Sequence, residues 1–204
     1  MTKSIDAFIL AGGNSSRMGF DKASLKLGGV AVIEQIARAL AGIADDVFIA
    51  GGSGEIAGVR RIPDLVAAAD ERSSLAGLYS ALRHASADWI AVAACDMPFV
   101  TTELFGILAS RRFEGGDAVI PHDRFGSVQP LCGLYRVEPC AEACRIAMEG
   151  VDLSLRGILR RVDTKWVDFD EIAHLPHSER LFFNLNTPDD VAEAEKMLAA
   201  GIRP

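Results

Sequence analysis

The sequence predicts an α/β protein with three layers, in which helices cover both faces of a mostly parallel, Rossmann-like sheet. Three observations support this prediction. Short apolar runs recur along the chain and end at glycine or polar residues, as buried strands do. Segments with apolar residues at helical spacing stand between these runs. Apolar strands that alternate with amphipathic helices are typical of a parallel sheet covered on both faces.

The first half of the chain alternates between the two kinds of element. The apolar runs at 7–10, 47–50 and 89–94 are predicted strands. Apolar residues at helical spacing predict helices over 31–40 and 75–82. Ligands of such sheets bind at the carboxyl ends of the strands. The segments that follow these strands are therefore candidates for a binding site.

The second half adds a capped helix and two further strands. Thr101 or Thr102 can cap a helix with its hydroxyl oxygen. Residues 118–120 and 131–137 are predicted strands that flank a turn around Gly126.

The C-terminal helix has the clearest local signal. Thr187 offers a capping hydroxyl, Pro188 occupies the first helical position, and two aspartates follow in the first turn. These residues predict an alanine-rich helix that ends at about Leu198.

The composition limits the classes of function. With 204 residues, 50% of them hydrophobic, the chain fits a single domain over residues 1–204. Its formal net charge of −7 argues against binding nucleic acid or an anionic membrane through a broad basic surface. The cysteines lack CxxC spacing, and the sequence contains neither a signal-like N-terminus nor an apolar run of about 18 residues. We therefore expect a cytoplasmic protein.

A glycine-rich run from Leu10 to Lys22 directly follows the first predicted strand and combines several phosphate-binding devices. Gly12 and Gly13 let backbone N–H groups approach an anion without a Cβ in the way. Arg17 offers a planar fork for phosphate oxygens, and Lys22 offers a mobile point charge. The run predicts a nucleoside triphosphate site. A plain surface turn is the alternative.

The spacing within this run differs from two commoner phosphate loops. In a Walker A loop, the lysine follows the last glycine directly and precedes serine or threonine. Here Lys22 lies three residues after Gly19 and precedes Ala23. The glycines also do not match the GxGxxG pattern, which counts against an NAD-binding domain.

The run resembles the signature LAGGxSxRMGxDKxxLxLxG of the molybdenum cofactor guanylyltransferases, the MobA family. Three further segments are similar to family elements in the same order: Ser74-Leu75-Ala76-Gly77-Leu78 to GPLAGL, Cys95-Asp96-Met97-Pro98 to CDxP, and Asn184-Leu185-Asn186-Thr187-Pro188 to NxNTP. The resemblance implies a nucleotidyltransferase sheet of GT-A-like type. It also implies transfer of GMP from GTP to the phosphate of molybdenum-molybdopterin, with release of pyrophosphate and formation of the molybdopterin guanine dinucleotide cofactor.

The resemblance assigns candidate roles to individual residues. Those expected to bind the nucleotide are Leu10, Ala11, Gly12, Gly13, Lys22, Asp64 and Asp96. Those expected to bind the acceptor are Ser74, Gly77, Asn184 and Asn186. The chain departs from the family pattern at two places. Ser73-Ser74 replaces Gly-Pro, and Ala50 or Gly51 stands where some members have a nucleotide-binding asparagine. The Leu-Ala-Gly-Gly form resembles the GTP-using branch.

The residues themselves fit such a transfer. The protein must mainly orient the phosphates and stabilise their charge, because the acceptor phosphate is itself the nucleophile. Mg²⁺ prefers oxygen ligands and takes one or two carboxylates, and Asp96 at a strand end can supply one. Lys22 and Arg17 would neutralise charge on the phosphates during transfer. Asp96, Arg17 and Lys22 are therefore the candidate catalytic residues, with Mg²⁺ as the cofactor.

Structural interpretations of several candidates stay open. Asp96 could form an Asx turn, and Asp64 after Pro63 could belong to a turn. Asn184 and Asn186 could be turn formers or paired amides at a strand end. Arginines at positions 156, 160 and 161 could form a salt-bridged surface or bind an anionic partner.

Alternative functions also stay open. One is a related transferase that uses CTP or another acceptor. Another is a non-catalytic nucleotide-binding protein that delivers the cofactor, because a fold does not fix a function. The resemblance implies GTP and molybdopterin as small-molecule substrates. It further suggests transient contact with molybdenum cofactor synthesis proteins or molybdoenzyme chaperones.

Overall fold

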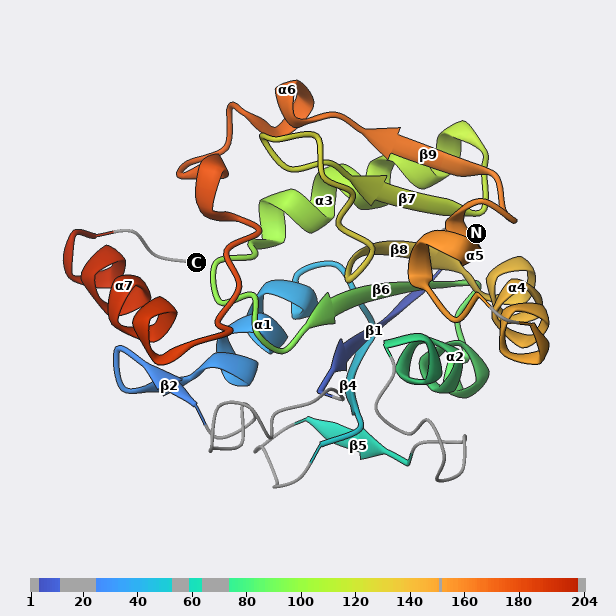
Figure 1. Cartoon of the computed structure of the whole chain (residues 1–204), viewed down its shortest axis with the longest axis horizontal. Helices are drawn as coiled ribbons and strands as arrows, with labels where there is room; N and C mark the ends of the chain where they lie inside the picture. The colour runs from blue at the N-terminus through green and yellow to red at the C-terminus, as the bar shows by residue number, and fades with distance from the viewer. Residues whose placement is uncertain (1–3, 12–24, 53–58, 64–73, 151, 202–204) are drawn as a thin grey trace.

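The computed structural model describes residues 4–11, 25–52, 59–63, 74–150 and 152–201. Its centre is a seven-stranded sheet in the order β5-β4-β1-β6-β8-β7-β9 (Figure 1). The strands of this sheet are β1 (Ile5–Leu10), β4 (Asp46–Ala50), β5 (Arg60–Ile62), β6 (Trp89–Ala94), β7 (Ala118–Pro121), β8 (Cys132–Arg136) and β9 (Thr164–Val167). A separate two-stranded hairpin consists of β2 (Lys26–Leu27) and β3 (Val30–Ala31).

Most neighbouring strands of the sheet run parallel. β1 is parallel to both β4 and β6, β4 is parallel to β5, and β7 is parallel to β9. Among the described strands of this sheet, only β8 runs against its neighbours, β6 and β7. The turn before β8 contains Gly126 at a φ of 75°, a conformation that glycine adopts readily. The predicted, mostly parallel sheet with a turn at this place is confirmed.

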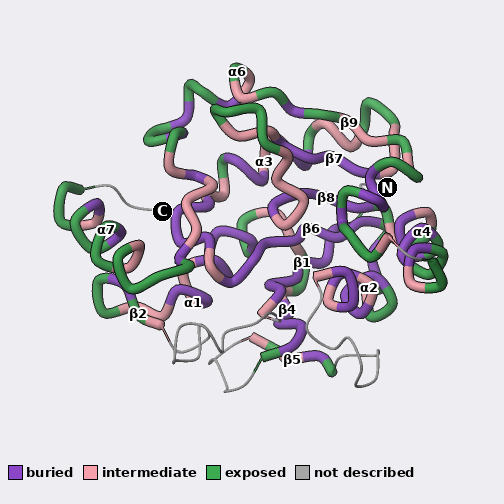
Figure 2. The backbone as a smooth tube through the Cα atoms, in the orientation of Figure 1, coloured by how far each residue is buried: buried purple, intermediate pink, exposed green. Residues whose placement is uncertain are grey.

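Helices cover both faces of the sheet. They are α1 (Val32–Ala41), α2 (Ser74–His84), α3 (Thr102–Arg111), α4 (Val137–Glu149), α5 (Leu155–Leu159), α6 (Phe169–Ile172) and α7 (Pro188–Ala199), with short 3₁₀ turns at Arg112–Glu114 and Ser178–Arg180. One face packs against α1, α3 and α7, and the other packs against α2, α4 and α5. Figure 2 shows the buried strands at the centre of the molecule. The predicted three-layer arrangement is confirmed. No helix in the described ranges has the length and apolarity needed to cross a membrane.

The side chains of β1 pack on both faces of the sheet. Ala7 and Ile9 belong to the core beneath α1 and α3, whereas Phe8 and Leu10 belong to the core beneath α2. Successive residues of a strand point to opposite faces of the sheet. A strand that is covered on both sides therefore needs no polar alternation, which explains the continuous apolar runs in the sequence.

Both predicted helix caps are present. The Thr101 hydroxyl accepts a hydrogen bond from the Leu104 N–H at 3.2 Å, so Thr101 is the N-cap and Thr102 is the first residue of α3. At the start of α7, the Thr187 hydroxyl accepts from the Asp190 N–H at 3.2 Å. The Asp190 carboxylate accepts in return from the Thr187 N–H at 2.7 Å. These reciprocal bonds form a capping box and fix the first turn of α7.

Several elements of the fold were not predicted. The strands of the β2–β3 hairpin have two residues each, and β5 has three residues, of which two are arginines. Segments of that length show no readable alternation. α4 begins directly after β8 and buries a face of small residues, namely Cys140, Ala141, Ala143, Cys144 and Ala147. These small residues recur at the spacing of an amphipathic helix, so α4 was missed although its pattern is present in the sequence.

Candidate active site

The carboxyl ends of three adjacent strands are level with one another. Leu10 at the end of β1 pairs in register with Ala50 of β4 and with Ala94 of β6. Beyond the sheet, the Ala11 N–H donates to the Ala50 carbonyl at 2.8 Å, and the Cys95 N–H donates to the Leu10 carbonyl at 3.2 Å. The segment that enters the glycine-rich run and the segment that carries Asp96 therefore leave the sheet side by side.

Asp96 lies in the turn that follows β6, and its side chain is half-buried. Two features hold this turn in place. The Asp96 carbonyl accepts a hydrogen bond from the Leu185 N–H at 2.9 Å. The side chains of Met97 and Phe99 are each 3% exposed and anchor the following residues in the core. The carboxylate is thus carried by a rigid turn at the sheet edge predicted from the sequence.

The first turn of α2 also stands at this edge. A Cβ added to Gly77 would lie 3.8 Å from both terminal methyl carbons of Leu10. Ser74, the first residue of the helix, is half-buried, and Leu75 and Leu78 are buried in the core below. The N-terminus of a helix carries a partial positive charge and free N–H groups, which favour an anion. The N-terminus of α2 therefore adds positive electrostatic potential to the site.

Asn184 and Asn186 lie on an irregular segment that precedes α7, so their interpretation as amides at a strand end is wrong. Leu185 between them is fully buried and makes the backbone bond to Asp96. The Asn184 amide donates to the Phe182 carbonyl at 2.9 Å. The Asn186 N–H donates to the Asp190 carboxylate at 2.8 Å. Apolar anchoring of Leu185, and not strand pairing, brings this segment to the Asp96 turn.

Several predicted site residues lie outside the described part of the chain. They are Gly12, Gly13, Arg17, Lys22 and Asp64. Those described are Leu10, Ala11, Ser74, Gly77, Asp96, Asn184 and Asn186. The contacts given above bring this second group to one edge of the sheet.

The glycine pair after β4 contributes to the same edge. Gly51 and Gly52 have φ values of 74° and 70°. A Cβ on Gly52 would lie 3.0 Å from the Ala11 Cβ and 3.1 Å from the Ala11 carbonyl oxygen. Glycine is therefore required both by the backbone conformation and by the close approach of Ala11. This explains why glycine follows β4 in this chain.

Arg61 is a residue of this edge that the sequence did not reveal. Its guanidinium donates to the Gly51 carbonyl, and its Nη1 lies 3.3 Å from the Cβ position of Gly52. Arg61 therefore holds the glycine pair and brings a cation near Ala11. Its strand, β5, is too short to give a sequence signal, and only its place beside β4 brings it to the site.

The cysteines serve the core and not the site. Cys95, Cys132, Cys140 and Cys144 are all buried. Burial raises the pKa of the Cys144 thiol to about 12 and also raises the pKa values of the Cys132 and Cys140 thiols. These three thiols stay protonated at neutral pH. Within the described ranges, no group of three or more His, Cys, Asp or Glu side chains could hold a metal ion.

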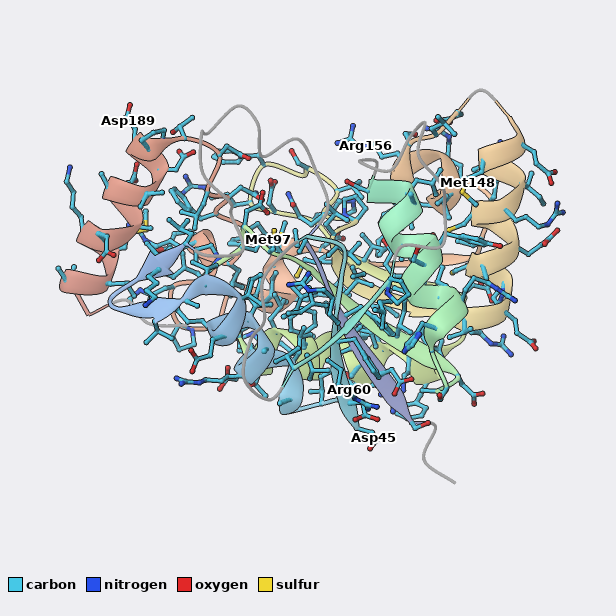
Figure 3. The ribbon with its side chains drawn as sticks, turned by 90° about the horizontal axis from the view of Figure 1, so that it is seen from below. Asp45, Arg60, Met97, Met148, Arg156 and Asp189 are labelled. Carbon is cyan, nitrogen blue, oxygen red and sulfur yellow. The ribbon has the colours of Figure 1, made fainter. Side chains whose placement is uncertain are left out.

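The arginines of the basic cluster have different surroundings. Arg160 forms an ion pair with Asp152 at 2.8 Å, and Arg161 donates to the Gly157 carbonyl at 2.9 Å. Arg156 is exposed on α5. Figure 3 shows Arg156 at the end of the molecule opposite to Asp45 and Arg60, which mark the amino ends of β4 and β5. The salt-bridged interpretation is confirmed for Arg160.

Comparisons with known proteins show the family of the chain. Residues 7–165 match the model of the MobA-like NTP transferase domain. A "Probable molybdenum cofactor guanylyltransferase" from Pelotomaculum thermopropionicum is 35% identical over 193 residues, which cover 93% of this chain and 91% of the relative. A protein of the same description from Natranaerobius thermophilus is 33% identical in an alignment 214 residues long, which spans 97% of this chain and 98% of the relative.

The fold is likewise similar to a solved structure. The crystal structure of molybdopterin-guanine dinucleotide biosynthesis protein A from Archaeoglobus fulgidus superposes with a TM-score of 0.79 at 27% sequence identity. The match covers 96% of this chain and 99% of that protein. The predicted nucleotidyltransferase type of the sheet is thereby confirmed. The chain belongs to the family of MobA-like NTP transferase domains.

Proposed function

We propose that this protein is a molybdenum cofactor guanylyltransferase, which transfers GMP from GTP to the phosphate of molybdenum-molybdopterin. The products are pyrophosphate and the molybdopterin guanine dinucleotide cofactor. The similarity to relatives described as molybdenum cofactor guanylyltransferases and as a molybdopterin-guanine dinucleotide biosynthesis protein supports this proposal. The structural observation that carries it is the hydrogen bond between the Cys95 N–H and the Leu10 carbonyl. It joins the start of the glycine-rich run to the turn with Asp96.

The triphosphate is proposed to bind where the chain leaves β1. Gly12 and Gly13 would offer backbone N–H groups and a close approach to the phosphates, and Leu10 and Ala11 would contact the nucleotide at the end of β1. The partial positive charge at the N-terminus of α2 supports the same binding mode, because Gly77 lies against Leu10. Asp64, which follows the end of β5 in sequence, is proposed as a further nucleotide contact.

The site residues fit a magnesium ion. Asp96 is a half-buried carboxylate on a turn fixed through its own carbonyl, so it offers a hard oxygen ligand at the sheet edge. Mg²⁺ usually takes one or two carboxylates and fills its remaining positions with water and phosphate oxygens. Asp96 is therefore the proposed protein ligand. When bound there, Mg²⁺ would neutralise charge on the phosphates.

The acceptor is proposed to bind beside Asp96, at Ser74, Gly77, Asn184 and Asn186. The buried Leu185 supports this assignment, because it keeps the two asparagines next to the Asp96 turn. The hydrogen bond from the Asn184 amide to the Phe182 carbonyl orients that side chain. Amides of this kind can bind phosphate oxygens or the edge of a pterin ring.

The transfer needs no nucleophilic side chain. An oxygen of the acceptor phosphate attacks the α-phosphorus of GTP and forms the new bond to it, while the bond to the β-phosphate oxygen breaks and pyrophosphate leaves in line. Arg17 is proposed to clamp phosphate oxygens. Lys22 is proposed to neutralise the charge that develops on the leaving group. The contribution of the protein is thus orientation and electrostatic stabilisation.

Protein partners form a separate part of the proposal. A labile pterin product favours direct handover to molybdenum cofactor synthesis proteins or molybdoenzyme chaperones. Affinity capture of the tagged protein from cells that make molybdoenzymes tests this idea. Recovery of no cofactor-synthesis or molybdoenzyme partner would argue against handover by contact.

Calorimetry with GTP, CTP and ATP in the presence of Mg²⁺ tests the nucleotide assignment. We expect GTP to bind most tightly. Tight binding of CTP without binding of GTP would overturn the choice of base. Tight binding of GTP without any transfer to the acceptor would instead favour a nucleotide-binding delivery protein.

A further inference from the structure

One segment near the C-terminus contacts two parts of the site that are far apart in the sequence. We call residues 183–198 the C-terminal brace. In Figure 1, the chain before α7 passes the end of β6, and α7 then lies beside the β2–β3 hairpin. This hairpin comes shortly after the glycine-rich run, because only residues 23–25 separate Lys22 from β2. The brace therefore connects the Asp96 turn with the hairpin.

The first contact of the brace is with the Asp96 turn. The Leu185 N–H donates to the Asp96 carbonyl at 2.9 Å, and the Leu185 side chain is fully buried. The ring of Phe183 packs edge-on against Phe99, with 6.1 Å between centroids and an interplanar angle of 64°. A backbone bond and two apolar contacts thus fix this end of the brace to the residues around Asp96.

The second contact is with the tip of the hairpin. The Gly28 N–H donates to the Glu195 carboxylate of α7 at 3.0 Å. Gly28 has a φ of 58°, and a Cβ added to it would lie 3.3 Å from the Leu198 Cδ1. Glycine therefore lets the tip approach α7 closely. Hydrogen bonds to a carboxylate are stronger than those to a neutral acceptor.

The stretch between these two contacts is rigid. The Asp190 carboxylate accepts from the Asn186 N–H at 2.8 Å and from the Thr187 N–H at 2.7 Å. These bonds tie the first turn of α7 to the residue that follows Leu185. A displacement of α7 would therefore be passed on to the Asp96 turn.

The hairpin is also held by the core, where Leu27 is buried, and by α1. The Gln35 amide donates to the Leu27 carbonyl at 3.0 Å and to the Val30 carbonyl at 3.2 Å. A groove of about 480 Å³ lies between the hairpin, α1 and α7, and its lining includes Gln35 and Glu195. Beside this groove, the hydrogen bond of Gly28 to Glu195 and its close approach to Leu198 hold the tip of the hairpin to α7.

We propose that Glu195 is a positioning residue for nucleotide transfer. By holding the hairpin at Gly28, it fixes residues 25–31 relative to the turn that carries Asp96. This inference rests on the proposed function, because it requires the triphosphate to bind between these two segments. It adds a residue at the far end of the chain to the machinery of the site.

Three variants of the full-length protein test the proposal. Glu195→Ala removes the acceptor of the Gly28 N–H. Glu195→Gln keeps an oxygen that can accept the bond. Glu193→Ala is the matched control, because Glu193 is also an exposed acidic residue of α7. The readouts are kcat/KM for GTP, the melting temperature, and hydrogen exchange in the peptide that covers residues 25–31.

We expect Glu195→Ala to lower kcat/KM for GTP by roughly three- to tenfold, the range set by the loss of one hydrogen bond. Hydrogen exchange at residues 25–31 should become faster in this variant alone. Glu195→Gln should stay within about twofold of the wild type, since the bond can re-form with a neutral acceptor. Glu193→Ala should match the wild type, and all melting temperatures should be similar.

Two results would overturn the proposal. One is that Glu195→Ala equals Glu193→Ala in both kcat/KM and hydrogen exchange. The other is that Glu195→Gln is as impaired as Glu195→Ala, which would point to the charge and not to the bond. A wild type that transfers no guanylate would sink the proposed function instead. GTP affinity and hydrogen exchange of the same variants would then still decide the role of Glu195.

Discussion

The two sides of the candidate site are built differently. The Asp96 turn extends from β6, a fully buried central strand, and Met97 and Phe99 anchor it in the core. The β2–β3 hairpin has only two residues in each strand and is held by the buried side chain of Leu27 and by side-chain bonds from Gln35 and Glu195. A carboxylate that must stay in place thus sits on the rigid side. Substitutions near Asp96 should therefore slow the transfer through loss of charge stabilisation. Those near the hairpin should slow it by displacing residues of the site.

The largest effect is expected for Asp96→Asn. Loss of the proposed metal ligand should lower turnover by roughly 10²- to 10³-fold, because several kcal/mol of charge stabilisation disappear. Its melting temperature should change little, since the half-buried side chain has no place in the apolar core. Initial rates measured over a range of Mg²⁺ concentrations check this prediction. Near-normal turnover at saturating Mg²⁺ would show that Asp96 does not hold the metal.

The substitution Gly52→Ala tests geometry at the end of β4. The new Cβ would meet the Ala11 Cβ at 3.0 Å, so the entrance to the glycine-rich run must shift. We expect roughly tenfold weaker GTP binding, because small displacements at such sites are costly. Calorimetry measures the affinity.

Gly126→Ala is the matched control for Gly52→Ala. Gly126 has a similar φ of 75°, but nothing lies within 4 Å of its Cβ position. Both variants should lose about 1–2 kcal/mol of the free energy of unfolding through left-handed strain. Only Gly52→Ala should bind GTP more weakly. Equal affinities in the two variants would contradict the role of the Ala11 contact.

The smallest effect is expected from two helix caps. Thr187→Ala and Thr101→Ala each remove a side-chain cap and should cost about 1 kcal/mol of the free energy of unfolding. Thr187 belongs to the brace, so its loss should also lower kcat/KM for GTP by about twofold. Thr101 begins a helix held by buried core residues, so its loss should leave kcat/KM unchanged. Denaturant titration measures the stability of both variants, and steady-state kinetics measures their kcat/KM. Equal kcat/KM values in the two variants would contradict the difference expected between Thr187 and Thr101.

Some elements of the fold could be predicted from the sequence, and others could not. β1, β4, β6 and the capped helices α3 and α7 were predictable because their signals are local, such as the apolar run that ends at Leu10. The hairpin and β5 are too short to give such signals, whereas α4 was missed although its buried face has helical spacing. Of the two interpretations left open for Asn184 and Asn186, the strand end is wrong, because the segment around them has no strand pairing. The contact of Gly28 with Glu195 spans 167 residues of sequence, and no local pattern encodes it.

The most direct test of the account is the mass of the product. Purified protein would be incubated with Mg²⁺, GTP and molybdenum-molybdopterin, and the acceptor would be analysed by mass spectrometry while pyrophosphate is quantified. We expect the acceptor to gain one GMP unit for each pyrophosphate released, and Asp96→Asn to form this product far more slowly. A CMP adduct in competition with CTP, or no adduct at all, would contradict it.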